Sequence, residues 1–398
     1  MSGSLAGAMA GTEAMAALFG AAGGARALLA VEAGFARAAA RGGRISPAAA
    51  AAIVAACDGA GAEFAGLDLA ALARAGAVAG TIVIPLVAWL RGRVGGHAAA
   101  VHRGLTSQDV IDTALVLQLR DGLALLEADL AAAAAATAGL ARDHAGTPML
   151  ARTLLQPALP TRFGLKAAGW MAGLDDARAS LRAAAAGALV LQCGGAAGTL
   201  DGFGPEPLRL AQAFAEELAL PLPPLPWHTR RAPLARLGAT LAAAVGVAGK
   251  IATDLALLMQ AEVGEASEPA APGRGGSSAM AHKRNPTLAI AARAAALRTP
   301  ALAATLLAAI PGEHERAAGA WQAEQAVWPE LMLAASGAFA AVREALAGLV
   351  VDPAAMARNL ALAPEAGASV AVGELLARAL AAHAAPAPPG YGPGSEEA

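Results

Sequence analysis

Five long stretches of the sequence show a helical pattern of apolar positions and consist largely of alanine and leucine, and alanine is the strongest helix former. They cover residues 107–144, 161–190, 233–263, 286–309 and 324–349. Asp109 and Asp112 lie near the start of the first stretch, where acidic side chains favour the helix dipole. We therefore expect an all-α protein whose long helices form a bundle.

The remaining sequence divides the chain into three parts. Residues 1–105 alternate short helical patterns with Gly and Pro breaks, which predicts an N-terminal helical domain. Residues 106–350 form the expected central long-helix bundle. Residues 351–398 predict a short C-terminal helical region, whose final segment "PAPPGYGPGSEEA" has the composition of a disordered tail.

The composition raises the question of what covers these helices, because 57% of residues are hydrophobic and only 15% are charged. Helices that are apolar on most sides are buried in a large core, a membrane or a partner. Residues 183–200 are uncharged but rich in Gly and Ala, and residues 75–90 contain Pro85, so neither resembles a transmembrane helix. No signal peptide is apparent. We expect burial against other copies of the chain, with no membrane.

Charge and cysteine content exclude some classes. A net charge of −2 gives no basis for nucleic-acid binding, and two distant cysteines, Cys57 and Cys193, suggest reduced thiols in the cytoplasm. Asp and Glu are absent from residues 144–174, 218–253 and 269–312, which carry several Lys and Arg. If the loops in these segments meet, they form a positive pocket for a small polyanion. Alternatively, the acidic residues simply lie on helix faces elsewhere.

Motifs for cofactors are missing. There is no Gly-rich nucleotide-binding pattern, and the His314–Glu315 pair lacks the second histidine of a zinc motif because Ala318 stands there. We therefore expect no cofactor and no metal.

Three interruptions between the helices carry candidate site residues. Thr106 and Ser107, at a helix start, could hold a carboxylate or could simply cap the helix. Gln156 could donate hydrogen bonds to a substrate or satisfy loop backbone. The segment "GRGGSSAMAHKRNP", residues 273–286, contains Lys283 and Asn285 and by composition would be a flexible surface loop.

The string "GSSAMAHKRNP" resembles the G-S-S-x-M-P-x-K-x-N-P signature of the fumarase/aspartase superfamily, except that Ala281 replaces the proline. "HRGLTSQDVIDTA" and "RTLLQPALPTRFG" resemble the family's two other active-site regions, so the resemblance covers most of the chain. "TSQDVIDTALVLQLRD", "GGAAGTLDGFG", "PWHTRR" and "ERAAGAWQAE" are more similar to the family's 3-carboxy-cis,cis-muconate cycloisomerases than to its lyases. Leu154 also stands where adenylosuccinate lyase, argininosuccinate lyase and fumarase have a histidine. A leucine cannot transfer a proton, which disfavours those lyases; the cycloisomerases have an aprotic tryptophan there.

The resemblance implies three helical domains, a homotetramer with a shared central bundle, and active sites built from three subunits. It implies a small polycarboxylate substrate that forms a lactone when one of its carboxylates adds to its own double bond. By the family pattern, Ser277 transfers the proton and Lys283 and Asn285 bind carboxylate. The further substrate-binding candidates are Thr106, Ser107, Gln156, Ser278, Met280, His102 and the weaker His228; for His102 a structural role is equally open. Another lyase of the superfamily, such as an adenylosuccinate-type enzyme, and a non-catalytic structural relative are the alternatives.

Overall fold

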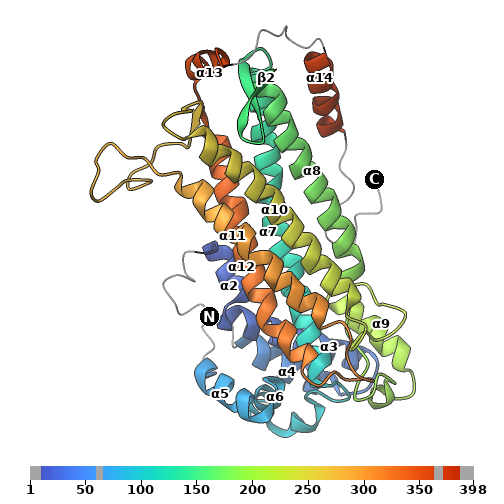
Figure 1. Cartoon of the computed structure of the whole chain (residues 1–398). Helices are drawn as coiled ribbons and strands as arrows, with labels where there is room; N and C mark the ends of the chain where they lie inside the picture. Colours follow the sequence, from blue (N-terminus) through green and yellow to red (C-terminus); the bar gives the residue numbers. More distant parts are fainter. Residues whose placement is uncertain (1–9, 60–65, 363–370, 386–398) are drawn as a thin grey trace.

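The computed structural model describes residues 10–59, 66–362 and 371–385. Figure 1 shows an elongated bundle of long helices with shorter helices gathered at its lower end. The long helices are α7 (Ser107–Asp143), α8 (Phe163–Ala188), α10 (Ala232–Leu258), α11 (Thr287–Ala308) and α12 (Ala320–Ala347). The all-α prediction is confirmed, and all five predicted helices are present with ends shifted by a few residues. The largest shift is at α10, which ends at Leu258 rather than near residue 263 because a turn begins at Met259.

Shorter helices precede the bundle and follow it. The preceding ones are α2 (Glu13–Phe19), α3 (Ala21–Arg41), α4 (Pro47–Gly59), α5 (Leu69–Ala79), α6 (Val83–Arg91) and the 3₁₀ turn η1 (Gly95–Ala100). Between α8 and α10 lie η2 (Asp201–Phe203) and α9 (Pro207–Glu217), and after the bundle come α13 (Pro353–Leu360) and α14 (Ala371–Ala384). The division into three domains remains a prediction, and the predicted disordered tail lies outside the described residues.

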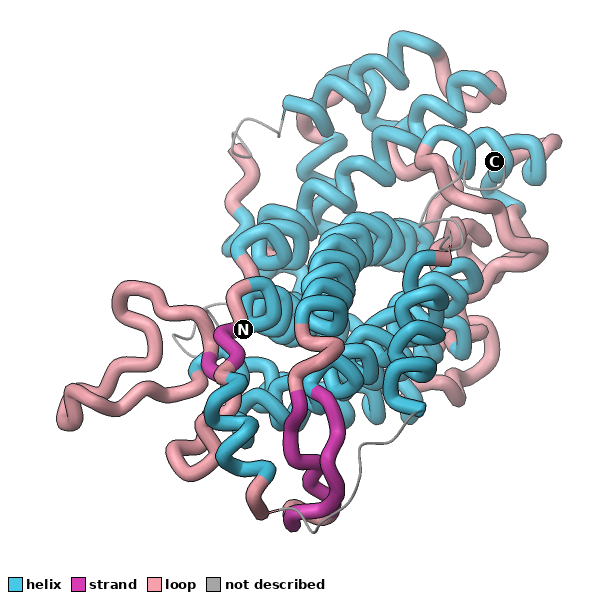
Figure 2. Tube along the Cα trace, turned by 90° about the horizontal axis from the view of Figure 1, so that it is seen from above, coloured by secondary structure: helices cyan, strands magenta, loops and turns pink. Residues whose placement is uncertain are grey.

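Two small antiparallel strand pairs sit near the upper end of the bundle, and the sequence did not predict them. β1 (Pro148–Thr153) and β2 (Gln156–Arg162) form a hairpin between α7 and α8, drawn in magenta in Figure 2. Leu154 and Leu155 form its turn with φ of 51° and 65°, a region that leucine rarely adopts. β3 (Ala266–Ser267) pairs with β4 (Val350–Val351).

The core is packed with small residues, which lets the long helices approach closely. A side chain added at Gly249 of α10 would lie 2.5 Å from Cβ of Ala296 in α11. Both cysteines are free and buried, and burial raises the pKa of Cys57 to about 12.

Within the described residues, α7, α10 and α11 are long and apolar enough to cross a membrane by length and composition. Only 39%, 56% and 28% of their most apolar windows are buried within the chain. These helices are not the two segments that the sequence singled out. Much of the apolar surface of these three helices is therefore left uncovered by the rest of the chain.

Candidate active site

The three candidate segments do not meet within one chain. Thr106 precedes α7, whereas the hairpin follows its other end, and a helix of 37 residues spans about 55 Å. The loop that carries Ser277 projects from the upper half of the bundle, away from the body of the molecule (Figure 1). A site that contains Thr106, Gln156 and Ser277 together therefore requires more than one copy of the chain.

The loop between β3 and α11 is fixed at its base and neck. The carboxylate of Glu268 accepts hydrogen bonds from the N–H groups of Leu288 and Ala289, at 3.1 and 2.7 Å, in the first turn of α11. At the neck, the backbone N–H of Asn285 donates to the Gly275 carbonyl at 2.8 Å, and its side-chain amide donates there at 3.2 Å. Gly275 has φ +66°, and a Cβ there would lie 2.6 Å from Asn285 O. Asn285 thus closes the neck, and its contact with substrate stays a prediction.

The tip of this loop presents the predicted chemical groups to solvent. Ser277 Oγ accepts hydrogen bonds from the N–H groups of Ala279 and Met280, at 3.3 and 3.1 Å. Two such donors would stabilise negative charge on this oxygen. Ser278 and Lys283 are exposed, as is Met280 at 43%, and the Lys283 ammonium forms no ion pair within the described part of the chain.

Several other cations of the acid-free segments are paired with acids from elsewhere. Arg152 pairs with Glu265, Arg231 with Asp112 and Glu324, Lys250 with Asp254, Arg274 with Glu344, and Arg298 with Glu330. For these residues the alternative reading holds, in which the acids lie on helices elsewhere. Within one chain they do not form a positive pocket.

The hairpin exposes its tip and anchors its stem. Gln156 is exposed beside the turn, and Leu154 and Leu155 are 96% and 72% exposed. In the stem, Arg152 makes two hydrogen bonds of 2.8 Å to the buried carboxylate of Glu265, which also accepts from Asn359 of α13. The hairpin is therefore tied to the residue that precedes β3 and to α13.

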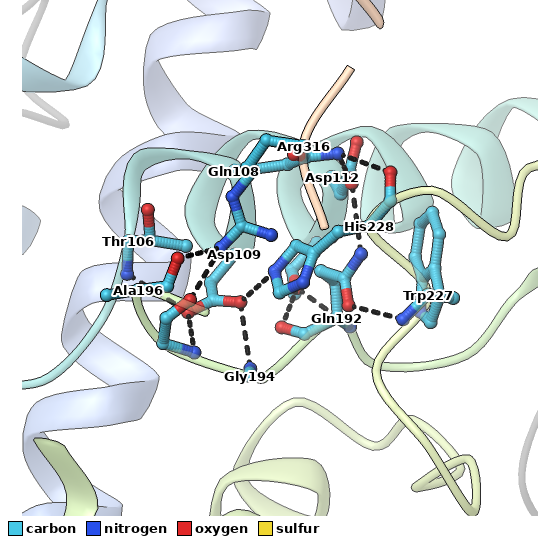
Figure 3. Close-up of polar contacts among 12 residues, drawn as sticks. Thr106, Gln108, Asp109, Asp112, Gln192, Gly194, Ala196, Trp227, His228 and Arg316 are labelled. Carbon is cyan, nitrogen blue, oxygen red and sulfur yellow. Dashed lines mark hydrogen bonds and ion pairs between the residues drawn. The ribbon is translucent and has the colours of Figure 1, made fainter. Parts of the chain in front are cut away.

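The first candidate segment is organised by Asp109, whose carboxylate is fully buried (Figure 3). It accepts from the N–H of Thr106 at 3.0 Å and from those of Gly194 and Gly195 at 2.9 Å each. His228 Nε2 lies 2.8 Å from the same carboxylate, and its side chain is 4% exposed. A contact between His228 and substrate would require the ring to leave Asp109, and it stays a prediction.

The first turn of α7 also carries the hydroxyl of Ser107, and a cation lies across this turn. Ser107 is half-buried, and its hydroxyl has no hydrogen-bond partner among the described residues. Arg316 lies across the first turn of α7 in Figure 3. Among the described residues, its guanidinium donates to backbone carbonyls alone, those of Gly195 at 2.6 Å, Ala196 at 3.1 Å and Glu315 at 2.9 Å. Burial lowers the pKa of Arg316, which Asp109 and Asp112 oppose.

Arg316 was missed in the sequence. It forms no ion pair within the described ranges, and its hydrogen bonds there neutralise none of its charge because they all go to backbone carbonyls. The one signal that could have found it is its place in "ERAAGAWQAE", a string that the resemblance had already singled out.

A second buried polar cluster, centred on Arg231, connects α7, α10 and α12 at the same end of the bundle. Arg231 binds Asp112 and Glu324, each at 2.7 Å, and Trp321 Nε1 donates to Asp112 at 3.0 Å. Burial opposes the charge of Arg231, but Asp112 and Glu324 outweigh it and raise its pKa overall. Burial also raises the pKa of Glu324, against the effect of Arg231.

His102 takes a strained position at the start of the first candidate segment. Its φ is +60°, and Nδ1 lies 2.6 Å from Oε1 of Glu32, which is 1% exposed. The ring therefore has a structural partner in the chain, and its proposed carboxylate contact is untested. No group of three or more His, Cys, Asp or Glu in the described part of the chain could hold a metal ion.

Comparison with known proteins identifies the family. A family model described as a lyase matches residues 11–300. The chain belongs to this lyase family. Among curated relatives of this lyase, a 3-carboxy-cis,cis-muconate cycloisomerase of Bradyrhizobium diazoefficiens is 49% identical over 337 residues, which are 84% of this chain and 74% of the relative. A nitrosuccinate lyase of Streptomyces davaonensis is 46% identical over 348 residues, or 84% and 72% of the two chains.

A solved structure of a related enzyme has the same fold as this lyase. The 3-carboxy-cis,cis-muconate lactonizing enzyme of Pseudomonas putida superposes with a TM-score of 0.84 at 43% identity, over 89% of this chain and 79% of that one. The resemblance stated from the sequence motifs is therefore confirmed, and the chain is an enzyme of the lyase superfamily related to these cycloisomerases.

Proposed function

We propose that this lyase-family enzyme lactonises 3-carboxy-cis,cis-muconate to 4-carboxymuconolactone, in the protocatechuate branch of the β-ketoadipate pathway. The observation that carries the proposal is Leu154 at the exposed hairpin tip. Lyases that expel an amine or hydroxyl need a proton donor for the leaving group, and leucine supplies none. Addition of a carboxylate within one molecule expels no group. The names of the cycloisomerase relatives point to the same reaction.

The reaction balances without a cofactor. One carboxylate oxygen forms a C–O bond to an alkene carbon, and the alkene electron pair moves to the neighbouring carbon, where an adjacent carboxylate spreads the charge. A proton then adds to that carbon. Cations and N–H donors that are already in place stabilise the carbanion without reorganisation. Lys283 on the loop and Arg316, which precedes α12 and lies against the start of α7, form no ion pair with any described residue and are suited to this role.

The remaining roles follow the family pattern. Ser277 delivers the proton, and closure of its loop brings it to the substrate. Asn285, Ser278 and Met280 line the substrate from the same loop, Thr106, Ser107 and His102 from the first segment, and Gln156 from the hairpin. His228, in "PWHTRR", is bound to Asp109 and supports the first segment from behind. Because the three segments lie apart in one chain, each site is completed by three subunits of a cytoplasmic homotetramer. That assembly also covers the apolar helix surface.

A second candidate activity is elimination of nitrite from nitrosuccinate. The favouring observation is the 46% identity with a lyase of that name. Nitrite departs as a stable anion, so this reaction also needs no proton donor at position 154. It differs from lactonisation in requiring a base rather than an acid at the carbon beside the carboxylate.

An ultraviolet assay of the purified protein separates these possibilities. We expect loss of the diene absorbance of 3-carboxymuconate, with no turnover of adenylosuccinate, argininosuccinate or fumarate. Release of nitrite from nitrosuccinate at a higher kcat/KM than lactonisation would transfer the assignment to that lyase. Absence of turnover with every substrate would leave only a structural role.

Replacement of Ser277 by alanine tests the proton donor. We expect Ser277→Ala to lower kcat by at least about 10²–10⁴-fold, the usual contribution of a general acid. Ser278→Ala is the matched control on the same loop and should cost far less. Both variants are checked for tetramer formation by sedimentation. Near-normal turnover of Ser277→Ala would mean that the proton comes from another group.

A further inference from the structure

Four sequence strings that set this chain apart from the histidine-containing lyases converge on one buried polar cluster. They cover residues 106–121, 194–204, 226–231 and 315–324. The first supplies Asp109, the second Gly194 and Gly195, the third His228 and the fourth Arg316 (Figure 3). Segments distant in the chain therefore share one hydrogen-bond network.

Asp109 at the centre of this cluster cannot contact a substrate. Its side chain has no exposed surface, and its two oxygens already serve four donors, two each. A buried carboxylate with all acceptor positions filled is costly to disturb. Its role is therefore to fix the groups that donate to it.

One of the groups bound to Asp109, the backbone of Gly195, also contacts Arg316. The N–H of Gly195 is bound to Asp109, and the carbonyl of the same residue accepts from the Arg316 guanidinium at 2.6 Å. Gly195 has φ +69°, which favours glycine, and a Cβ at Gly194 would lie 2.6 Å from Cε1 of His228. The backbone at Gly194 and Gly195 is thus held between the His228 ring and the Asp109 carboxylate. This backbone in turn holds the Arg316 guanidinium.

We propose that Asp109 and His228 are positioning residues that hold the loop at Gly194 and Gly195, and through it hold Arg316 where it receives one carboxylate of the substrate. The proposal rests on the proposed function and says how the enzyme would bind one carboxylate of that substrate. The Arg316 guanidinium must be held in position, because a charge-assisted hydrogen bond to a carboxylate weakens steeply when its geometry is poor. Loss of either positioning residue would release the guanidinium without removing its charge.

A double-mutant cycle tests the coupling. Asp109→Asn keeps the size of the side chain but turns an NH₂ group toward N–H donors, so at least one donor loses its acceptor. We expect Asp109→Asn and Arg316→Gln each to lower kcat/KM by about tenfold or more, chiefly through a higher KM. The double variant should be no worse than Arg316→Gln alone, because both changes remove the same contact. Multiplicative losses would overturn the proposal.

The control is a second histidine–aspartate pair with a similar N···O distance, which is more exposed than the first. His383 Nδ1 of α14 lies 2.7 Å from Asp175 Oδ2, far along the chain from this cluster. His383→Gln should leave KM unchanged with or without Arg316→Gln. An equal rise in KM would show that any lost pair acts through general stability, against the proposal.

A readout without turnover separates this inference from the proposed function. The dissociation constant of propane-1,2,3-tricarboxylate, measured by calorimetry, should rise in Asp109→Asn and Arg316→Gln and not further in the double variant. If this pattern holds while 3-carboxymuconate is not converted, only the proposed reaction fails.

If Asp109→Asn does not fold, His228 supplies the test. His228→Gln can still donate to Asp109 and should bind the tricarboxylate nearly as well as wild type, whereas His228→Leu should bind it several-fold more weakly. Equal binding by the two variants would refute a positioning role.

Discussion

At the scale of single residues, Arg231 is a buried cation with two acidic partners. It neutralises two buried carboxylates, those of Asp112 and Glu324, and is itself 2% exposed. Removing one partner of such a group leaves unpaired charge in a medium of low polarity, which costs far more than the intact group contributes. Arg231 therefore stabilises the start of α7 against α10 and α12.

We expect Arg231→Met to lower the free energy of unfolding by about 3–5 kcal/mol, because both carboxylates lose their counter-ion. Arg41→Met is the matched control, since Arg41 also binds two carboxylates, Glu216 and Glu217, but at the surface. It should change stability far less. Urea unfolding of both variants gives the comparison, and equal losses would mean that burial does not decide the cost.

Residue partners were the part of the site that the sequence predicted least well. Ser277, Lys283 and Gln156 could be found because they lie within recognisable strings. The pairing of His102 with Glu32, 70 positions away, has no local signal. Arg316 was missed for the same reason, since its contacts with Gly195 and Ala196 arise only when the chain has folded.

At the scale of elements, helix length and apolar content were sufficient to predict the bundle. The hairpin was not predictable because its turn, Leu154–Leu155, lacks the Asn and Gly that such turns favour. Tertiary contacts hold it instead, chiefly the pair of Arg152 with Glu265. Long helices follow from local patterns, whereas this hairpin depends on a residue more than 100 positions away.

The contact between α10 and α11 gives a prediction at this scale. Gly249→Ala places a methyl group against Ala296 and should destabilise the fold by about 1–3 kcal/mol through overpacking. Gly246→Ala, on the same helix with open space around it, should instead stabilise by about 0.5–1 kcal/mol. Thermal unfolding distinguishes the two variants. Higher stability of both would show that α10 and α11 move apart at no cost to accommodate the added methyl group.

At the scale of the whole molecule, apolar helix surface remains uncovered in one chain. On α11, Ile290, Leu297 and Leu307 are 51%, 83% and 47% exposed. Ile290 and Leu297, two turns apart, lie on the same face of α11, and an exposed apolar face marks an interaction surface. The proposed tetramer places it between subunits.

We expect wild-type protein to sediment as about four chains and Leu297→Asp to dissociate, because a carboxylate would be buried in the helix interface. Val78→Asp is the matched control: Val78 is 92% exposed on α5, outside the long helices, and the variant should remain assembled. A wild-type monomer would contradict the proposed tetramer and its shared sites, whereas a tetramer of Leu297→Asp would place the interface elsewhere.

The way in which Glu268 closes the base of the Ser277 loop has a consequence for how new activities arise in this enzyme. Because Glu268 holds the first turn of α11 and Asn285 closes the neck on Gly275, residues 276–284 at the tip form no hydrogen bond or ion pair with the described helices. Mutations at the tip are therefore nearly free of folding penalty. Such a loop can accumulate variation and explore other substrates while the bundle that supports it stays the same.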